Sequence, residues 1–94
     1  MSDLTYRPRG HYFEEIEVGQ GLVTAGRTIT ESDIVSFASL SGDFNQIHVD
    51  AEYAAAGEFG QRVAHGLLVV SVTTGPIVQT GLMEGTVMAF RALQ

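Results

Sequence analysis

An aspartate and a histidine, Asp43 and His48, lie five residues apart in the stretch 41–48. A carboxylate and an imidazole are side chains that commonly transfer protons in enzymes. Gly42 and Asn45 are typical of turns, because glycine accepts positive φ and the asparagine side chain bonds nearby backbone amides. Facing positions on a helix are three or four residues apart, so we expect a loop to bring the pair together. The sequence therefore predicts a turn that directs both side chains to one water molecule.

Each of these residues also has a structural interpretation. Asp43 and Asn45 could simply make turn and cap hydrogen bonds. His48 could be a surface histidine or a satisfied core histidine, and with Asp50 it could form a pair of metal ligands. Two ligands without a cysteine or a further histidine cluster make a poor metal site. We therefore predict no metal and no cofactor.

The elements that must position the pair are predicted from their capping residues. Thr30 and Asp33 form a capping-box pattern, which predicts a helix that stops at Gly42. Asp50 is expected to cap a second, short helix over residues 51–56. The histidine of the pair is therefore expected just ahead of a helix start.

A long uncharged stretch runs from Val63 to Met83, interrupted only by His65 if that histidine is protonated. Its length could span a bilayer, but it contains serine, threonine, proline and glutamine, which favour a helix inside a protein. A helix that is apolar on nearly all sides has to be covered on nearly all sides. We therefore expect a buried central helix.

Short extended segments are expected before and after that helix. β-Branched and aromatic residues predict strands at 22–24, 27–29 and 86–93. Gly81 and Gly85 are expected to bracket the turn that leads into the last of these strands.

Composition excludes several classes of protein. The 94 residues are enough for one domain, and five basic against eleven acidic residues give a net charge of −6. This charge opposes general attraction to nucleic acid or to an anionic membrane. The absence of cysteine excludes disulfides and a cysteine nucleophile and is compatible with the cytoplasm. No secretory signal is predicted, because the N-terminus has no apolar stretch before a small-residue cleavage site.

The residues from Phe37 to His48, followed by Ala54 and the run Ala64–Leu68, resemble the MaoC-type, (R)-specific enoyl-CoA hydratase family. The opening Tyr12–Gly19 is similar to the start of many members. The resemblance implies an α+β hot-dog fold, in which an antiparallel sheet wraps a long central helix. It also implies reversible addition of water to a trans-2-enoyl-CoA thioester, which gives a 3-hydroxyacyl-CoA, a reaction of fatty acid metabolism.

Carried over residue by residue, the catalytic aspartate and histidine of the family fall on Asp43 and His48. Hydration needs a base for the water and a proton donor for the α-carbon, and the pair is assigned to the water jointly. The backbone amide of Gly66, at the start of the central helix, can stabilise charge on the thioester oxygen. Asn45 and Thr74 are weaker candidates for orienting the pair.

Several of these residues have structural alternatives as well. His65 and Gly66 could be no more than the start of a helix, and Thr74 could be a hydroxyl that packs between helices. Arg62 could meet a substrate phosphate, although an arginine ahead of a helix could equally be solvated.

The sequence departs from the family pattern at Gln46, where the motif usually has proline. Family members also continue past the strand at 86–93 with further strands. We therefore expect residues 1–94 to form a single MaoC-like domain, the N-terminal part of a hot-dog domain whose remaining cover comes from a missing segment or a partner chain.

Two function classes follow from this pattern. The first is a hydratase or dehydratase that works as a homodimer on an acyl-CoA thioester. The alternative is a non-catalytic hot-dog module for acyl-thioester binding or subunit assembly.

Overall fold

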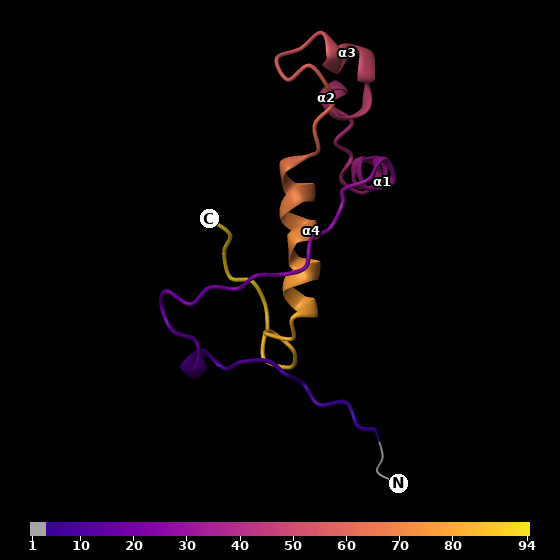
Figure 1. Ribbon diagram of the computed structural model, residues 1–94. Coiled ribbons are helices and arrows are strands. Elements are labelled where there is room, and N and C mark those ends of the chain that lie inside the picture. The colour runs from indigo at the N-terminus through magenta and orange to yellow at the C-terminus, as the bar shows by residue number, and fades with distance from the viewer. Residues whose placement is uncertain (1–3) are drawn as a thin grey trace. The chain divides into compact units, whose positions relative to one another are not determined.

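The computed structural model describes residues 4–94, and within that range every regular element is a helix. Backbone contacts divide the described chain into two compact units, one formed by Gly26–Thr73 and the other by the residues up to Ala25 together with Thr74–Gln94. Figure 1 labels the α-helices, which follow a short 3-10 helix. In chain order the elements are η1 (Phe13–Glu15), α1 (Glu31–Ser41), α2 (Gln46–Val49), α3 (Ala51–Ala55) and α4 (Gly66–Gln79).

The first long helix, α1, begins and ends where its capping residues predict. The Thr30 hydroxyl accepts a hydrogen bond from the Asp33 amide at 3.2 Å, and the Asp33 carboxylate accepts one from the Thr30 amide at 2.8 Å. These reciprocal bonds are a capping box. At the other end Gly42 has a left-handed φ of 80°, and its amide donates to the Ala38 carbonyl. Both predicted ends of this helix are confirmed.

The segment after Gly42 differs from the expected loop, because its second half is helical. The Asn45 side chain accepts a hydrogen bond from the Ile47 amide at 3.2 Å and so caps α2. His48 lies in the last turn of this helix. His48 therefore lies just ahead of the helix that Asp50 caps, as expected, but it lies in a short helix of its own and not in a loop.

The next helix, α3, confirms its prediction. The Asp50 carboxylate accepts hydrogen bonds from the amides of Glu52 and Tyr53 at 3.1 and 3.0 Å, so it caps this short helix.

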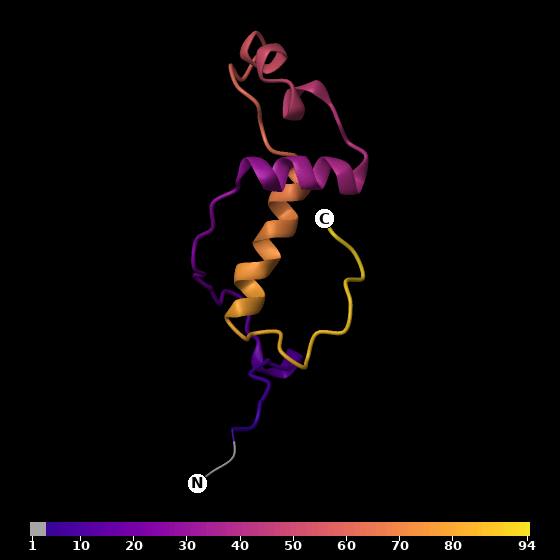
Figure 2. The ribbon, with the colours of Figure 1, turned by 90° about the vertical axis from the view of Figure 1, so that its right-hand side faces the viewer.

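The long helix α4 begins at Gly66, as expected, and Pro76 lies in its last turn. Among the residues that the structure describes, no helix is long and apolar enough to cross a membrane. Figure 1 and Figure 2 show α1 lying across the beginning of α4. Phe37 of α1 and Gly66 of α4 line one pocket with Asp43 and His48, so the predicted catalytic residues lie near this crossing.

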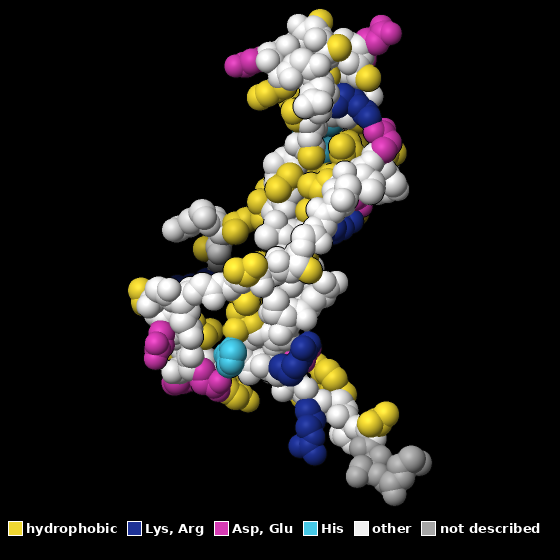
Figure 3. All heavy atoms as spheres, in the orientation of Figure 1, with side chains coloured by type: hydrophobic (Ala, Val, Ile, Leu, Met, Phe, Trp, Pro, Cys, Tyr) yellow, Lys and Arg dark blue, Asp and Glu magenta, His cyan; other side chains and the backbone are white. Residues whose placement is uncertain are grey.

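Little of the apolar surface is covered within residues 4–94. The buried apolar residues there are Ala38, Ala54 and Leu68, while on α4 Leu67 is 66% exposed and Val70 is 44% exposed. Figure 3 shows apolar side chains, in yellow, at several places on the visible surface. The central helix is therefore not buried within the described chain, and the expectation that a missing segment or a partner chain supplies its remaining cover stays a prediction.

The strands expected at 22–24, 27–29 and 86–93 are not formed between residues 4 and 94. A strand requires a neighbouring backbone with which its amides and carbonyls pair, so β-propensity alone is insufficient. The turn before the last segment is confirmed, because Gly81 and Gly85 have positive φ values of 85° and 74°.

One ion pair joins the segment near the N-terminus to the turn after α4. Arg9 Nη2 lies 2.6 Å from Glu84 Oε1, and the Arg9 amide donates to Glu84 Oε2 at 3.0 Å. Backbone bonds run alongside, from the Gly10 amide to the Glu84 carbonyl and from the His11 amide to the Leu82 carbonyl. The hydrogen bond from Arg9 lowers the pKa of Glu84 to about 2.

Candidate active site

A pocket of about 330 Å³ gathers three residues that sequence analysis assigned to catalysis, namely Asp43, His48 and Gly66. All of its lining belongs to the compact unit Gly26–Thr73. The remaining lining residues are Phe37, Ser41, His65 and Leu67.

Backbone contacts hold Asp43 at one carboxylate oxygen and leave the other open. The Asn45 amide donates to Asp43 Oδ1 at 3.2 Å, and the Asp43 amide donates to Ser41 Oγ at 3.1 Å. The second oxygen, Oδ2, lies 3.8 Å from His48 Nε2. The Asp43 side chain is about half exposed, with 51% of its surface accessible, so Oδ2 faces both His48 and solvent.

One backbone carbonyl orients the ring of His48. Nδ1 lies 2.7 Å from the Val63 oxygen, and because a carbonyl only accepts hydrogen bonds, the proton of this bond is on Nδ1. In the neutral ring Nε2 is then an acceptor. It faces another acceptor, Asp43 Oδ2, at 3.8 Å, which is too long for a direct hydrogen bond. A single water molecule can donate its two hydrogens to two acceptors at this spacing.

His65 belongs to the same cluster, although sequence analysis treated it only as part of a helix start. It is 2% exposed, and its Nε2 lies 2.9 Å from the backbone oxygen of Asp43. Its ring stacks on His48 with centroids 3.8 Å apart, and it meets the edge of Phe37 at 4.9 Å. A second histidine directly before the glycine of the central helix was the available sequence signal.

Gly66 presents the first turn of α4 to the pocket. The first intrahelical bond runs from the Val69 amide to the His65 carbonyl, so helix geometry leaves the preceding amides without an acceptor in α4. A Cβ built on Gly66 would meet nothing within 4 Å, and Gly66 is not among the positive-φ glycines of the described chain. Neither crowding nor backbone conformation therefore requires glycine here. An open amide at a helix N-terminus suits a developing negative charge.

The two weaker candidates lie outside the pocket lining. Asn45 contributes through its cap on α2, the helix that carries His48. Thr74 follows Gly66 by eight residues on α4, about 12 Å by helical rise. An orienting role for either residue stays a prediction.

Arg62 lies outside the pocket lining and forms an ion pair with Glu31. Its guanidinium binds both carboxylate oxygens of Glu31, and Nη1 also lies 3.4 Å from the His48 carbonyl oxygen. The hydrogen bond to Glu31 raises the pKa of Arg62, and the same bond lowers the pKa of Glu31. Contact of Arg62 with a substrate phosphate stays a prediction.

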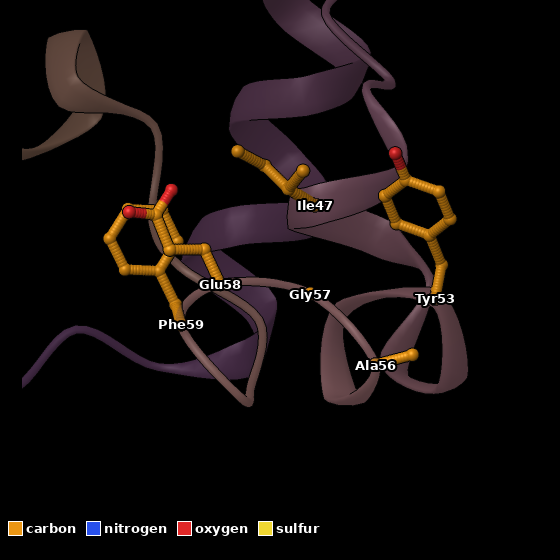
Figure 4. A pocket seen from close by; sticks show the side chains of 6 residues that line it. All are labelled: Ile47, Tyr53, Ala56, Gly57, Glu58 and Phe59. Atoms are coloured by element: carbon orange, nitrogen blue, oxygen red, sulfur yellow. The ribbon is translucent and has the colours of Figure 1, made fainter.

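A second hollow, of about 400 Å³, lies over α2, α3 and the loop that follows them. Figure 4 shows Phe59 and Tyr53 on opposite sides of Ile47, with Glu58 beside Phe59. This hollow contains no histidine, so it lacks the paired proton-transfer groups of the first pocket.

Asp43, His48 and His65 also bring together side chains that can bind metal ions. Each residue offers one ligand atom, and these atoms lie within 4.8 Å of one another. The two imidazole planes are stacked at 26°, and the in-plane lone pairs of nearly parallel rings do not converge well on one tetrahedral ion. The arrangement suits proton transfer better, and the absence of a metal stays a prediction.

Residues 14–94 match the MaoC like domain family, so the chain belongs to this family. The resemblance inferred from the motif residues is confirmed. Protein MaoC of Klebsiella aerogenes is 48% identical over 75 residues, which cover 80% of this chain and 22% of that protein. The (R)-specific enoyl-CoA hydratase of Rhodospirillum rubrum is 52% identical over 58 residues, which cover 62% of this chain and 40% of the enzyme.

A solved structure is also similar. The monoamine oxidase regulatory protein from Archaeoglobus fulgidus aligns with a TM-score of 0.69 and 41% identity, covering 76% of this chain and 46% of that one. The present chain thus spans less than half the length of each of these three proteins.

Proposed function

We propose that the chain carries the catalytic site of a hydratase or dehydratase that adds water reversibly to a trans-2-enoyl-CoA and gives a 3-hydroxyacyl-CoA. The observation that carries the proposal is the placement of Asp43 Oδ2 and His48 Nε2, 3.8 Å apart, in one pocket with Gly66. Relatives named as hydratases and dehydratases support the reaction class.

In the proposed reaction the water lies between the two acceptors of Asp43 and His48. As its oxygen bonds to C3 of the enoyl group, its proton moves to the pair, and the C2=C3 electron pair shifts toward the thioester oxygen. The amide of Gly66 stabilises the resulting enolate oxygen. A proton then returns to C2 and completes the addition, and dehydration follows the same steps backwards. A positioned acid or base typically contributes on the order of a hundredfold to ten-thousandfold to such a step.

The contacts of His48 favour its part in this cycle. When Nε2 takes a proton, the ring becomes a cation with two N–H donors. One donor already has the Val63 carbonyl as its acceptor, and the other faces the Asp43 carboxylate. The protonated ring therefore keeps its bond to Val63, and the Asp43 carboxylate at 3.8 Å is a nearby negative charge that stabilises the cation.

For the whole protein we propose a hot-dog fold and a homodimer without a metal or other cofactor, located in the cytoplasm. Two features of residues 4–94 support a sheet that covers this helix: the side chains exposed along α4, and the segments 22–24, 27–29 and 86–93, which form no strand there. Covering apolar surface stabilises by about 25 cal/mol per Å².

The test is the hydration of trans-2-butenoyl-CoA by the purified protein, followed as loss of the conjugated thioester absorbance. We expect turnover in the wild type and a decrease on the order of a hundredfold or more in Asp43→Asn. Asp50→Asn is the matched control, because Asp50 lies outside the pocket lining and asparagine also caps helices.

Circular dichroism must show that both variants are folded. An Asp43→Asn variant with the wild-type rate contradicts the assigned role of Asp43. A folded wild type that binds the thioester without turnover contradicts the enzyme and supports the alternative of a non-catalytic binding module.

A further inference from the structure

The buried ring of His65 contacts both members of the Asp43–His48 pair. Its Nε2 bonds the Asp43 backbone oxygen at 2.9 Å, and its face lies 3.8 Å from the His48 ring between centroids. The two residues of the pair come from different segments, the loop after α1 and the helix α2. The His65 side chain therefore links the backbone of Asp43 to the ring of His48.

The hydrogen bond defines the tautomer of His65. A carbonyl oxygen only accepts, so the proton of this bond is on Nε2. The other nitrogen, Nδ1, is buried and has no hydrogen-bond partner among the described residues. A second proton at Nδ1 would therefore have no acceptor there, and the ring is best satisfied as the neutral Nε2–H form.

The remaining contacts of Asp43 show why this link matters. Its amide donates to Ser41 Oγ, and its carboxylate Oδ1 accepts from the Asn45 amide, so both bonds reach residues only two positions away along the chain. These bonds shape the loop but do not join it to α4. The bond from His65 joins the loop to the start of α4, where Gly66 lies.

We propose that His65 is a positioning residue, which sets the separation between the Asp43 carboxylate, His48 and the Gly66 amide through its Nε2–H bond to the Asp43 carbonyl. The inference rests on the proposed hydration, because its consequence is the geometry of that reaction. His65 itself exchanges no proton with substrate or water. A misplacement of about 1 Å can cost on the order of a hundredfold in rate, so one backbone contact is sufficient to matter.

Two substitutions separate the hydrogen bond from the ring contact. His65→Gln keeps an N–H donor near the position of Nε2 but removes the aromatic ring. His65→Phe keeps a ring that can stack on His48 but removes the donor. We expect kcat for trans-2-butenoyl-CoA to decrease at least on the order of tenfold in His65→Phe with little change in KM, and to stay close to wild type in His65→Gln.

The opposite order, with activity kept in the phenylalanine variant and lost in the glutamine variant, overturns the proposal, as does wild-type kcat in both. A measurement on the unmodified protein covers the case in which a variant does not fold. Imidazole ¹⁵N shifts at a pH where both rings are neutral should report an Nε2–H tautomer for His65 and an Nδ1–H tautomer for His48. An Nδ1–H tautomer for His65 overturns the proposal.

The tautomer measurement needs no substrate. A wild type without turnover would contradict the proposed function, whereas the tautomers decide the placement of His65 independently of that result.

Discussion

His48 donates from Nδ1 to the Val63 carbonyl at 2.7 Å, and the Val63 amide donates at 3.1 Å to the carbonyl of Ile47, the residue before the histidine. The two bonds hold the segment before α4 against α2, because Val63 accepts one hydrogen bond and donates the other. They also leave Nε2 as the acceptor that faces Asp43. A single backbone segment thus determines both the position and the tautomer of the proposed base.

This relationship predicts different outcomes for two amide substitutions of His48. Asparagine places an N–H near the position of Nδ1, so His48→Asn can keep the bond to the Val63 carbonyl while losing the base. His48→Gln extends past that position and leaves the carbonyl unpaired, at a cost of about 1 kcal/mol or more. We expect both variants to lose hydration, and the glutamine variant to unfold at lower denaturant concentration.

Denaturant unfolding and the hydration assay check this prediction together. Equal stability of the two variants would show that the bond to Val63 contributes little. Retained turnover in either one would remove His48 from the proposed chemistry.

A second prediction concerns the open space at Gly66. Because a Cβ there would meet nothing within 4 Å, Gly66→Ala should fold as well as the wild type. The added methyl group would instead occupy part of the pocket at the amide that we assign to the thioester oxygen. We expect a decrease in kcat/KM on the order of tenfold to a hundredfold, because a methyl group that keeps the thioester oxygen away from this amide loses part of the contribution of one oxyanion donor.

The matched control for that substitution is Gly57→Ala. A Cβ on Gly57 would make an ordinary contact with the Ala54 carbonyl oxygen at 3.5 Å, and Gly57 does not line the proposed active site. Its kcat/KM should equal that of the wild type. A fully active Gly66→Ala variant would argue against substrate approach to this amide.

Sequence reasoning succeeded where the determining contacts are local. The cap of α1 at Thr30 and that of α3 at Asp50 depend on amides two or three residues away, and the end of α1 depends on the positive φ of Gly42. These signals are contained in a few consecutive residues. They were sufficient to predict α1 and α3, the helices on either side of the pair.

Most of what the sequence did not predict, or what the described residues leave unconfirmed, depends on distant partners. The contact between His65 and Asp43 spans 22 residues, and no local pattern records it. The strands expected at 22–24 and 86–93 need a neighbouring backbone, and β-propensity does not say which one. The helix α2 was missed for a different reason, since its asparagine cap is equally typical of a turn.

A third prediction tests whether the cap on α2 supports the site. Asn45→Ala removes the side-chain acceptor of the Ile47 amide, whereas Asn45→Ser provides another. Because α2 carries His48, we expect the alanine variant to lose about 1 kcal/mol of stability and to hydrate more slowly, and the serine variant to retain most of both. Denaturant unfolding and kcat measured on the same samples check this. Equal kcat in the two variants would limit Asn45 to a contribution outside catalysis.

The last prediction concerns acid. The hydrogen bond from Arg9 lowers the pKa of Glu84 from 4.5 to about 2, and the Thr30 amide lowers the pKa of Asp33. A group whose pKa is lower in the folded state stabilises folding above its unfolded pKa, and this contribution is lost as the pH falls toward the folded value. We therefore expect the free energy of unfolding to decrease between about pH 5 and pH 2.

Glu84→Gln should be less stable than the wild type at neutral pH, and the difference should shrink as the pH falls through this window. A difference that stays constant from pH 7 to pH 2 would show that the Arg9–Glu84 pair does not contribute through its charge.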